Sequence, residues 1–302
     1  MESTEERIQK LKKEKDAVIL AHYYTDGQVQ AVADYVGDSY YLSKIANEVS
    51  NRVIVLCGVY FMGESAKILN PEKTVILADK LADCPMAHMV TGEKIRKIRE
   101  EYQDVAVVCY VNSAAEIKAL SDVCVTSSNA LKIVKALPNQ YIYFVPDRNL
   151  GRYISEMVPE KKVILNEGFC PVHDRITAEQ VERAKKKYPE AVVLAHPECR
   201  WDVLKMADYI GSTSGIINFA VKSLSDEFII CTEMGVLYEL EQKCPGKKFY
   251  PAGENQSCEG MKRVTVEKIL EQLEREDNVV EQRGNEFDKA NQALAKMLEL
   301  AK

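Results

Sequence analysis

The stretch Ala33-Asp-Tyr-Val-Gly-Asp-Ser39 has two counterparts further along the chain, Ser121-Asp-Val-Cys-Val-Thr-Ser127 and Ala207-Asp-Tyr-Ile-Gly-Ser-Thr213. The first aspartates of the three stretches lie 88 residues (34 to 122) and 86 residues (122 to 208) apart. Each stretch follows an apolar run rich in β-branched residues, at 17–22, 106–112 and 191–196. A fixed period of this size indicates a structural unit that occurs three times.

Each unit contains four short strand-like runs that alternate with helical patterns. The third runs cover 52–57, 141–145 and 227–231, and the fourth cover 74–78, 162–165 and 248–251. Such alternation is typical of a parallel sheet with helices on both faces. We therefore expect an α/β fold of three αβα sandwich domains, each with a four-stranded parallel sheet, related by a pseudo-threefold axis around a central active site.

The expected domains are residues 1–84, 85–170 and 171–264. Residues 265–302 lie outside the third unit, and 266–273 and 287–300 carry apolar residues at helical spacing. We expect these C-terminal helices to pack back on the first unit and so to complete it.

Composition limits the class of protein. The chain has 302 residues, of which 46% are hydrophobic, and no run approaches the roughly 18 apolar residues of a membrane span. The first 15 residues form a charged helical pattern rather than a signal peptide, so we expect a cytoplasmic protein without a membrane partner. Nine cysteines then indicate metal ligands and core thiols rather than disulfides. A net charge of −6 argues against nucleic-acid binding, but helix N-termini can still bind a small anion.

Reactive side chains follow the expected strands, where ligand sites of open parallel sheets lie. The first strands are followed by His22, Tyr24, Tyr110, Asn112, His196 and Glu198. The second strands are followed by Ser39, Ser127, Ser212 and Thr213. The fourth strands are followed by Cys84, Cys170 and Cys258, which are 86 (84 to 170) and 88 (170 to 258) residues apart. We expect all these side chains to meet at one cavity.

Two interpretations of the three spaced cysteines stay open at this point. A repeat can carry a buried core thiol in every copy, although Cys84 and Cys170 precede prolines and Cys258 lies in a polar loop, which favours ligation. Three thiolates with a free fourth position suit either zinc or an iron–sulfur cluster. The remaining cysteines are predicted to be core residues of strands (Cys57, Cys109, Cys124, Cys231), a residue of the cavity wall (Cys199) and a loop residue (Cys244).

The serines and histidines also have an ordinary structural interpretation. A serine before a helix is commonly an N-cap, and a histidine at the end of a strand is often a hydrogen-bonded residue of the sheet edge. Three such caps that converge would instead form a site for phosphate or carboxylate. His22 and His196 occupy equivalent positions of two units, which favours a functional role.

Along nearly its whole length the chain resembles the quinolinate synthase family. The resemblance rests on ordered motifs: AHxY (21–24), GDS (37–39), FMxE (61–64), YVNS (110–113), TSxNA (126–130), PDRNLG (146–151), CPVH (170–173), HPEC (196–199) and GST (211–213). It implies a [4Fe–4S] cluster on Cys84, Cys170 and Cys258. It further implies condensation of iminoaspartate with dihydroxyacetone phosphate to quinolinate, with release of phosphate and two waters.

The resemblance also implies roles for single residues. The catalytic set is His22, Tyr24, Tyr110, His196 and Glu198, with the last two as an acid–base pair. The substrate-binding set is His22, Ser39, Tyr110, Asn112, Ser127, His173, His196, Glu198, Ser212 and Thr213. Ser128 is expected to support a helix, and His88 to lie on the surface. Tyr23, Tyr60 and Phe169 depart from the usual motifs, and the last two could alter the wall or gating of the cavity.

Two other functions are considered beside the condensing enzyme. An aconitase-like hydro-lyase would use the same three-cysteine iron centre, and a non-enzymatic scaffold would bind zinc through it. For the condensing enzyme the resemblance implies an upstream supplier of iminoaspartate, either L-aspartate oxidase or aspartate dehydrogenase.

Overall fold

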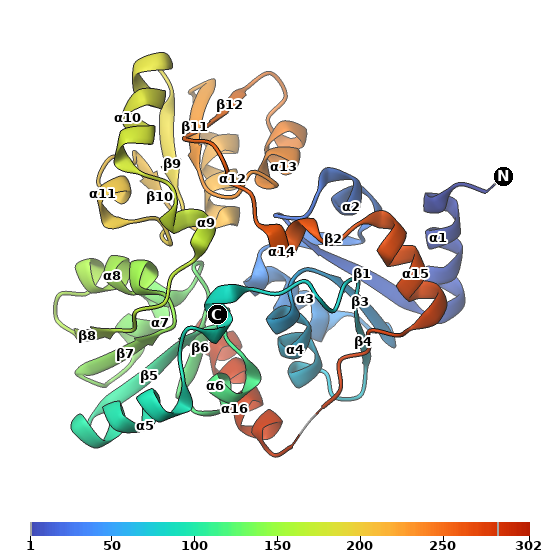
Figure 1. Cartoon of the computed structure of the whole chain (residues 1–302), viewed down its shortest axis with the longest axis horizontal. Helices are drawn as coiled ribbons and strands as arrows, with labels where there is room; N and C mark the ends of the chain where they lie inside the picture. Colours follow the sequence, from blue (N-terminus) through green and yellow to red (C-terminus); the bar gives the residue numbers. More distant parts are fainter. Residues whose placement is uncertain (1, 283) are drawn as a thin grey trace.

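The chain forms three four-stranded parallel sheets, as the sequence pattern predicts. The structure is a computed structural model that describes residues 2–282 and 284–302. Figure 1 shows the three sheets, with their helices, arranged around a common centre. The strand order is second, first, third, fourth in every sheet. The three-domain α/β fold class is thus confirmed, whereas the domain boundaries at 84 and 170 stay a prediction.

The strands of the three sheets match the predicted runs closely. The first sheet contains β1 (Ala17–His22), β2 (Tyr35–Gly37), β3 (Val53–Cys57) and β4 (Thr74–Leu77). The second contains β5 (Val105–Tyr110), β6 (Val123–Val125), β7 (Tyr141–Val145) and β8 (Lys162–Leu165). The third contains β9 (Val192–Ala195), β10 (Tyr209–Ile210), β11 (Glu227–Cys231) and β12 (Lys248–Pro251).

The helices that connect these strands are mostly short. In the first unit they are α1 (Thr4–Lys15), α2 (Gly27–Val32), α3 (Ser39–Glu48) and α4 (Tyr60–Leu69). In the second they are the 3₁₀-helix η1 (Pro85–His88), α5 (Gly92–Glu101), α6 (Ala115–Ala119), α7 (Ala130–Ala136) and α8 (Arg148–Met157). In the third they are α9 (Pro171–Asp174), α10 (Ala178–Lys187), α11 (Trp201–Leu204), α12 (Thr213–Lys222), α13 (Val236–Lys243) and α14 (Glu259–Lys262). None of the helices among the described residues is long and apolar enough to cross a membrane.

The repeated aspartates have a structural role in every unit. Asp34, Asp122 and Asp208 each accept a hydrogen bond from a backbone N–H of the neighbouring first strand, at 2.7–2.8 Å. This bond fixes the start of the second strand against the first. The aspartates therefore recur because the local fold recurs, and they lie away from the centre of the molecule.

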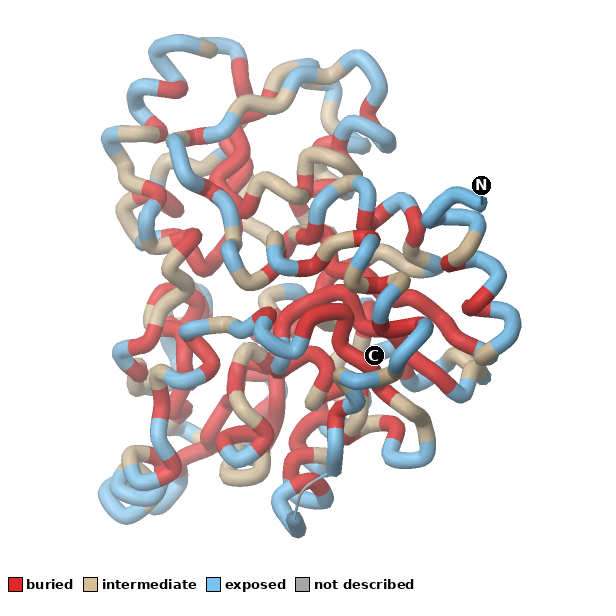
Figure 2. Tube along the Cα trace, turned by 45° about the vertical axis from the view of Figure 1, so that its right-hand side comes forward, coloured by how far each residue is buried: buried red, intermediate tan, exposed pale blue. Residues whose placement is uncertain are grey.

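The hydrophobic core is continuous through the first two units and divided in the third. Strands β1 and β5 are buried along their whole length, so they carry apolar residues on both faces. Figure 2 shows buried segments gathered in the interior of the molecule and exposed segments mainly at its periphery. The third sheet has separate apolar clusters on its two faces, one around Val193 and one around Phe228.

The C-terminal helices join the first two units. α15 (Val266–Arg275) packs beside α1 of the first unit, but α16 (Glu286–Leu300) lies mainly against α6 and β6 of the second unit and also contacts α4. The buried face of α16 carries the small side chains of Ala290 and Ala293, which allow close approach to a neighbouring helix. The expectation that this segment packs back on the first unit therefore describes α15 better than α16, which contacts the first unit through α4 but packs mainly on the second.

Candidate functional site at the centre of the three sheets

One cavity at the carboxyl ends of the strands receives side chains from all three units. Its empty space is about 630 Å³, open solvent included. Of the residues expected at the site, those that line it are His22, Tyr24, Ser39, Cys84, Tyr110, Asn112, Ser127, Cys170, His173, His196, Glu198, Thr213 and Cys258. Ser212 lies outside this lining: its Oγ accepts the backbone N–H of Gly215 and caps α12.

The three spaced cysteines occupy equivalent places in the fold. Cys84, Cys170 and Cys258 are the N-cap residues of η1, α9 and α14, the short helices that follow the fourth strand of each unit. All three are half-buried free thiols with extended backbone conformation. Burial raises the pKa of each thiol, and backbone N–H groups of the following turn act in the opposite direction. These amides point at sulfur and would stabilise a bound thiolate.

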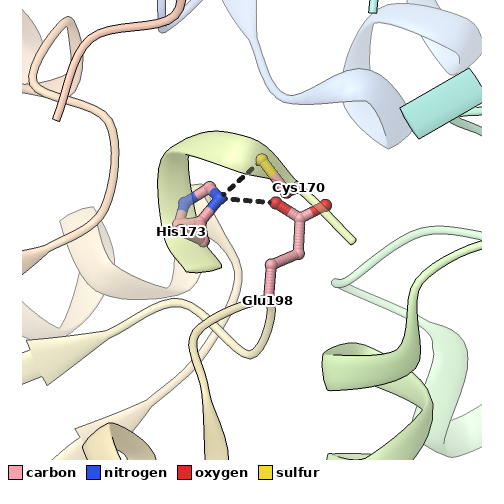
Figure 3. A group of neighbouring side chains, drawn as sticks. All are labelled: Cys170, His173 and Glu198. Carbon is pink, nitrogen blue, oxygen red and sulfur yellow. Dashed lines mark hydrogen bonds and ion pairs between the residues drawn. The ribbon is translucent and has the colours of Figure 1, made fainter. Parts of the chain in front are cut away.

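A metal centre fits this donor set. Three thiolates in one half-buried cavity would repel one another, and two of them raise the pKa of a neighbour: Cys258 does so for Cys84, and Cys84 for Cys170. A cation that binds all three sulfurs removes this cost. A second donor group overlaps the first at one member, since ligand atoms of Cys170, His173 and Glu198 lie within 4.8 Å of one another (Figure 3).

Histidine and glutamate side chains form a buried network beside the cysteines. The Oε2 atom of Glu198 lies 2.7 Å from Nδ1 of His173 and 3.5 Å from Nδ1 of His196. The same Nδ1 atom of His173 lies 3.2 Å from the sulfur of Cys170, and Figure 3 shows both contacts. The rings of His173 and His196 stack with centroids 4.6 Å apart. The other carboxylate oxygen of Glu198 is buried without a hydrogen-bond partner among the described residues, so it is available to a ligand.

The charge state of this network follows from burial and from neighbouring groups. Burial lowers the pKa of His196 to about 3 and that of His22 to about 4. Burial alone would raise the pKa of Glu198, but His173 and His196 outweigh this effect and lower it to about 2. At neutral pH the cavity therefore contains the neutral imidazoles of His22 and His196 and the carboxylate of Glu198.

A chain of hydroxyl groups extends from this network. The hydroxyl of Tyr24 lies 2.7 Å from Oγ1 of Thr213 and 2.8 Å from Oγ1 of Thr232. Thr232 in turn lies 2.8 Å from Nε2 of His173. Because the carboxylate of Glu198 only accepts, Nδ1 of His173 donates to it, and in the neutral imidazole Nε2 then accepts from Thr232. The chain thus joins Tyr24 to Glu198 through Thr232 and His173.

Hydroxyl groups at helix N-termini also line the cavity. Ser39 is the first residue of α3, and Thr213 is the first residue of α12. Ser127 lies in the turn before α7, with its Oγ 3.1 Å from Nε2 of His196. Ser128 also lines the cavity and donates to Asp38, and its supporting role stays a prediction. Together with the positive ends of α3 and α12, these hydroxyls can bind an anionic group.

The other cysteines lie away from the cavity lining. Four of them are buried in strands, as predicted: Cys57, Cys109, Cys124 and Cys231. Cys199 was expected in the cavity wall, but it lies outside the lining, where it is buried and its thiol donates to the carbonyl of Cys231. Cys244 was expected in a loop, but it caps the end of α13 and is buried in the core of the third unit.

The structure also shows where His88 and the three residues that depart from the usual motifs lie. Tyr23 is buried and packs in the apolar cluster of the third sheet, so it ties β1 to that unit. Neither Tyr60 nor Phe169 lines the cavity; Tyr60 is 40% exposed, and Phe169 lies under the guanidinium of Arg148 at 4.3 Å. His88 is exposed on the surface, as expected, and pairs with an aspartate.

Sequence reasoning missed four polar residues of the site. Asp38, Thr126 and Glu233 line the cavity, and Thr232 contacts the lining residues Tyr24 and His173. Glu233 is fully buried and accepts backbone N–H groups of Gly235 at 2.6 Å and of Cys258 at 3.1 Å, which fixes the loop of that cysteine. A usable signal was present, since Thr232 and Glu233 directly follow a buried strand and Asp38 belongs to the GDS motif.

Comparisons with known proteins agree with the site. The family model described as Quinolinate synthetase A protein matches residues 6–299. The chain is 54% identical to a quinolinate synthase of Fusobacterium nucleatum over 296 residues, which cover 98% of this chain and 99% of the relative. It is 48% identical to a quinolinate synthase of Caldicellulosiruptor saccharolyticus over 301 residues, 100% of this chain and 99% of the relative. It is also 48% identical to that of Clostridioides difficile over 295 residues, 98% and 97% of the two chains.

Proposed function

Since the chain belongs to the quinolinate synthase family and is an enzyme of NAD biosynthesis, we propose that its central cavity condenses iminoaspartate with dihydroxyacetone phosphate. The products are quinolinate, one phosphate and two waters, which together contain all atoms of the two substrates. We place the reaction in the cytoplasm, with L-aspartate oxidase or aspartate dehydrogenase as the supplier of iminoaspartate. The observation that carries the proposal is the meeting of three equivalent cysteines with a buried histidine–glutamate network in one cavity.

Cys84, Cys170 and Cys258 would hold a [4Fe–4S] cluster. The fit rests on three free thiols from three units, each with helix-terminal amides directed at its sulfur. A cluster held by three thiolates supplies a Lewis acid for a substrate hydroxyl or carboxylate.

Substrate anions would be bound by neutral donors rather than by cations. Nδ1 of His22 accepts the backbone N–H of Tyr24 at 3.1 Å, so the neutral ring carries its proton on Nε2 and can donate it to a phosphate or carboxylate oxygen. Ser39, Ser127 and Thr213 would add hydroxyl donors. Asn112 would orient a carboxylate by donating from its Nδ2–H groups. Its Oδ1 atom is buried and lacks a partner among the described residues, so it can accept a substrate N–H or O–H.

Proton transfers would run through the network of Glu198. Imine–enamine tautomerisation, condensation and dehydration each need a base and an acid near neutral pH. Glu198, with its lowered pKa, stays a carboxylate that polarises His173. His196 is neutral and accepts the backbone N–H of Glu198 on Nδ1 at 3.3 Å, so its proton lies on Nε2, from which it can donate. Burial raises the pKa of Tyr24 and of Tyr110 well above the usual value, so both keep their protons and act as donors.

Anaerobic purification and assay test this function. We expect about four irons per chain, a broad absorbance near ~400 nm, and formation of quinolinate only when both substrates are supplied. About one zinc per chain with no such absorbance would support the scaffold alternative. Hydration or dehydration of a hydroxy acid without consumption of dihydroxyacetone phosphate would support the hydro-lyase alternative.

A further inference from the structure

Asp38 is a carboxylate that joins the three units at the cavity. It follows β2 and is 6% exposed. Its Oδ1 accepts the backbone N–H of Tyr41 at 2.9 Å and so caps α3 of the first unit. Its Oδ2 accepts the hydroxyl of Ser128 in the second unit at 3.0 Å and also the hydroxyl of Ser214 in the third. One side chain therefore contacts all three units.

The two serines that donate to Asp38 come from corresponding parts of the fold. Ser128 lies in the turn between β6 and α7, and Ser214 is the second residue of α12. Asp38 itself lies between β2 and α3. All three segments connect the second strand of a unit to the helix that follows, so their contact fixes the three helix N-termini relative to one another.

Each member of this contact is next in sequence to a hydroxyl that lines the cavity. Asp38 precedes Ser39, Ser128 follows Ser127, and Ser214 follows Thr213. Neighbouring residues in a turn or a first helical turn cannot move independently. The position of Asp38 thus sets the spacing of three hydroxyl groups that come from three separate sheets.

Charge explains why a carboxylate suits this place. Hydrogen bonds to an ionised acceptor are stronger than those between neutral groups, so a carboxylate holds two hydroxyls from other units better than an amide would. It also accepts the protons of Ser128 and Ser214, so these two hydroxyls hold the units together and do not donate to a ligand.

We propose that Asp38 is a positioning residue that holds Ser39, Ser127 and Thr213 together as one binding site for an anionic group of the substrate. The group is a phosphate or a carboxylate, and the inference rests on the function proposed above. Asp38 acts through the serines and does not itself bind the ligand.

The test compares Asp38→Asn with a matched variant in the cluster-loaded enzyme. Asparagine still caps a helix, but it lacks the charge that holds Ser128 and Ser214. The control, Asp208→Asn, removes a carboxylate that bonds only within the third unit, to the N–H of Val193 at 2.8 Å. Dihydroxyacetone phosphate and quinolinate are titrated separately by anaerobic calorimetry.

We expect Asp38→Asn to raise the Kd of at least one ligand about tenfold, as for loss of one charge-assisted hydrogen bond, and Asp208→Asn to change it less than about twofold. If only the affinity for dihydroxyacetone phosphate falls, the site binds phosphate. If only the affinity for quinolinate falls, the site binds a carboxylate. The combined Asp38→Asn and Ser214→Ala variant should bind no more weakly than Asp38→Asn alone, because both remove the same contact. If Asp38 had only a structural role, Asp38→Asn would lower Tm without raising the Kd of either ligand.

Unchanged Kd values for both ligands in Asp38→Asn would overturn the proposal. If that variant does not fold, the double variant Ser128→Ala and Ser214→Ala, which keeps the carboxylate, should show the same tenfold rise in Kd. Unchanged Kd values in this double variant would overturn the proposal equally. Wild-type enzyme that binds neither ligand and forms no quinolinate would overturn the proposed function as well. Normal binding and turnover in the wild type confine any failure to Asp38.

Discussion

Replacement of Thr232 by Val should slow the reaction much more than it weakens the fold. Thr232 is fully buried, and its Oγ1 lies 2.8 Å from both the hydroxyl of Tyr24 and Nε2 of His173. Valine has nearly the same shape but no hydroxyl, so the substitution opens no cavity. It interrupts the chain that joins Tyr24 to Glu198, and the lining of the cavity keeps its other groups.

The structure sets the size of both effects. Tyr24 keeps its contact with Thr213, whereas Nε2 of His173 loses the donor hydroxyl that it contacts. One buried acceptor without a donor costs about 1–3 kcal/mol, which lowers Tm by a few degrees in a chain of this size. General acid–base catalysis contributes roughly 10²- to 10⁴-fold to a rate. Loss of the link between the two groups should therefore lower kcat about 10²-fold and leave KM within about threefold.

The assay measures anaerobic formation of quinolinate at saturating concentrations of both substrates, with iron content measured on the same samples. Thr232→Ser keeps the hydroxyl and should restore kcat to within about fivefold of the wild type. A Thr232→Val enzyme with full iron content and unchanged kcat would refute the relay. A Thr232→Ser enzyme as slow as Thr232→Val would show that the methyl group, and hence packing, is what matters.

Three further predictions concern the metal, pH and stability. Changing any one of the three cavity cysteines to Ser should remove the iron and its absorbance. The control Cys57→Ser should keep both and lower only Tm. Equal iron loss in all four variants would contradict the ligand assignment. Burial of Asp79 opposes its ionisation, but the hydrogen bond from Lys268 prevails and lowers its pKa. Asp79 therefore adds stability above about pH 4 that is lost as the pH falls through its lowered pKa. The Asp79→Asn variant should have a lower free energy of unfolding at pH 7 than the wild type, and this free energy should fall less on acidification. Urea titrations at several pH values measure both effects. Lys118 is fully buried with Nζ 2.5 Å from the carbonyl of Ser113, so Lys118→Met should cost about 1–3 kcal/mol of unfolding free energy, and an unchanged urea midpoint would contradict this.

The sequence could predict the strands because local composition decides them. The runs at 141–145, 162–165, 227–231 and 248–251 coincide with β7, β8, β11 and β12 residue for residue. The β-branched and aromatic residues in them suit a buried parallel strand, and no tertiary contact overrides that preference. The boundaries differ elsewhere: the run predicted at 106–112 corresponds to β5 at Val105–Tyr110, which begins one residue earlier and ends two residues earlier.

Contacts between units could not be predicted in the same way. The hydrogen bonds of Asp38 to Ser128 and Ser214 join residues 90 and 176 positions apart. The GDS motif draws attention to Asp38, but it does not say which residues of the other units the carboxylate contacts. The placement of α16 between two units has the same origin, because its apolar face fits either neighbour and only the assembled chain selects one.

The cysteines are the same residue type in all three units, whereas the other site residues differ between units at equivalent positions, and this difference has a physical reason. The strand register aligns Ala21, Cys109 and Ala195 through their pairing with the third strands of their sheets. One residue further along are His22, Tyr110 and His196, and three residues further are Tyr24, Asn112 and Glu198. A cluster presents like faces to the three units, so a repeated fold can bind it with one repeated residue type. The two proposed substrates have no such symmetry, and each unit must therefore offer a different group at equivalent positions. The repeated cysteines are therefore the candidate metal ligands, the repeated aspartates serve the fold, and divergence at equivalent positions marks the groups that would bind and convert the substrates.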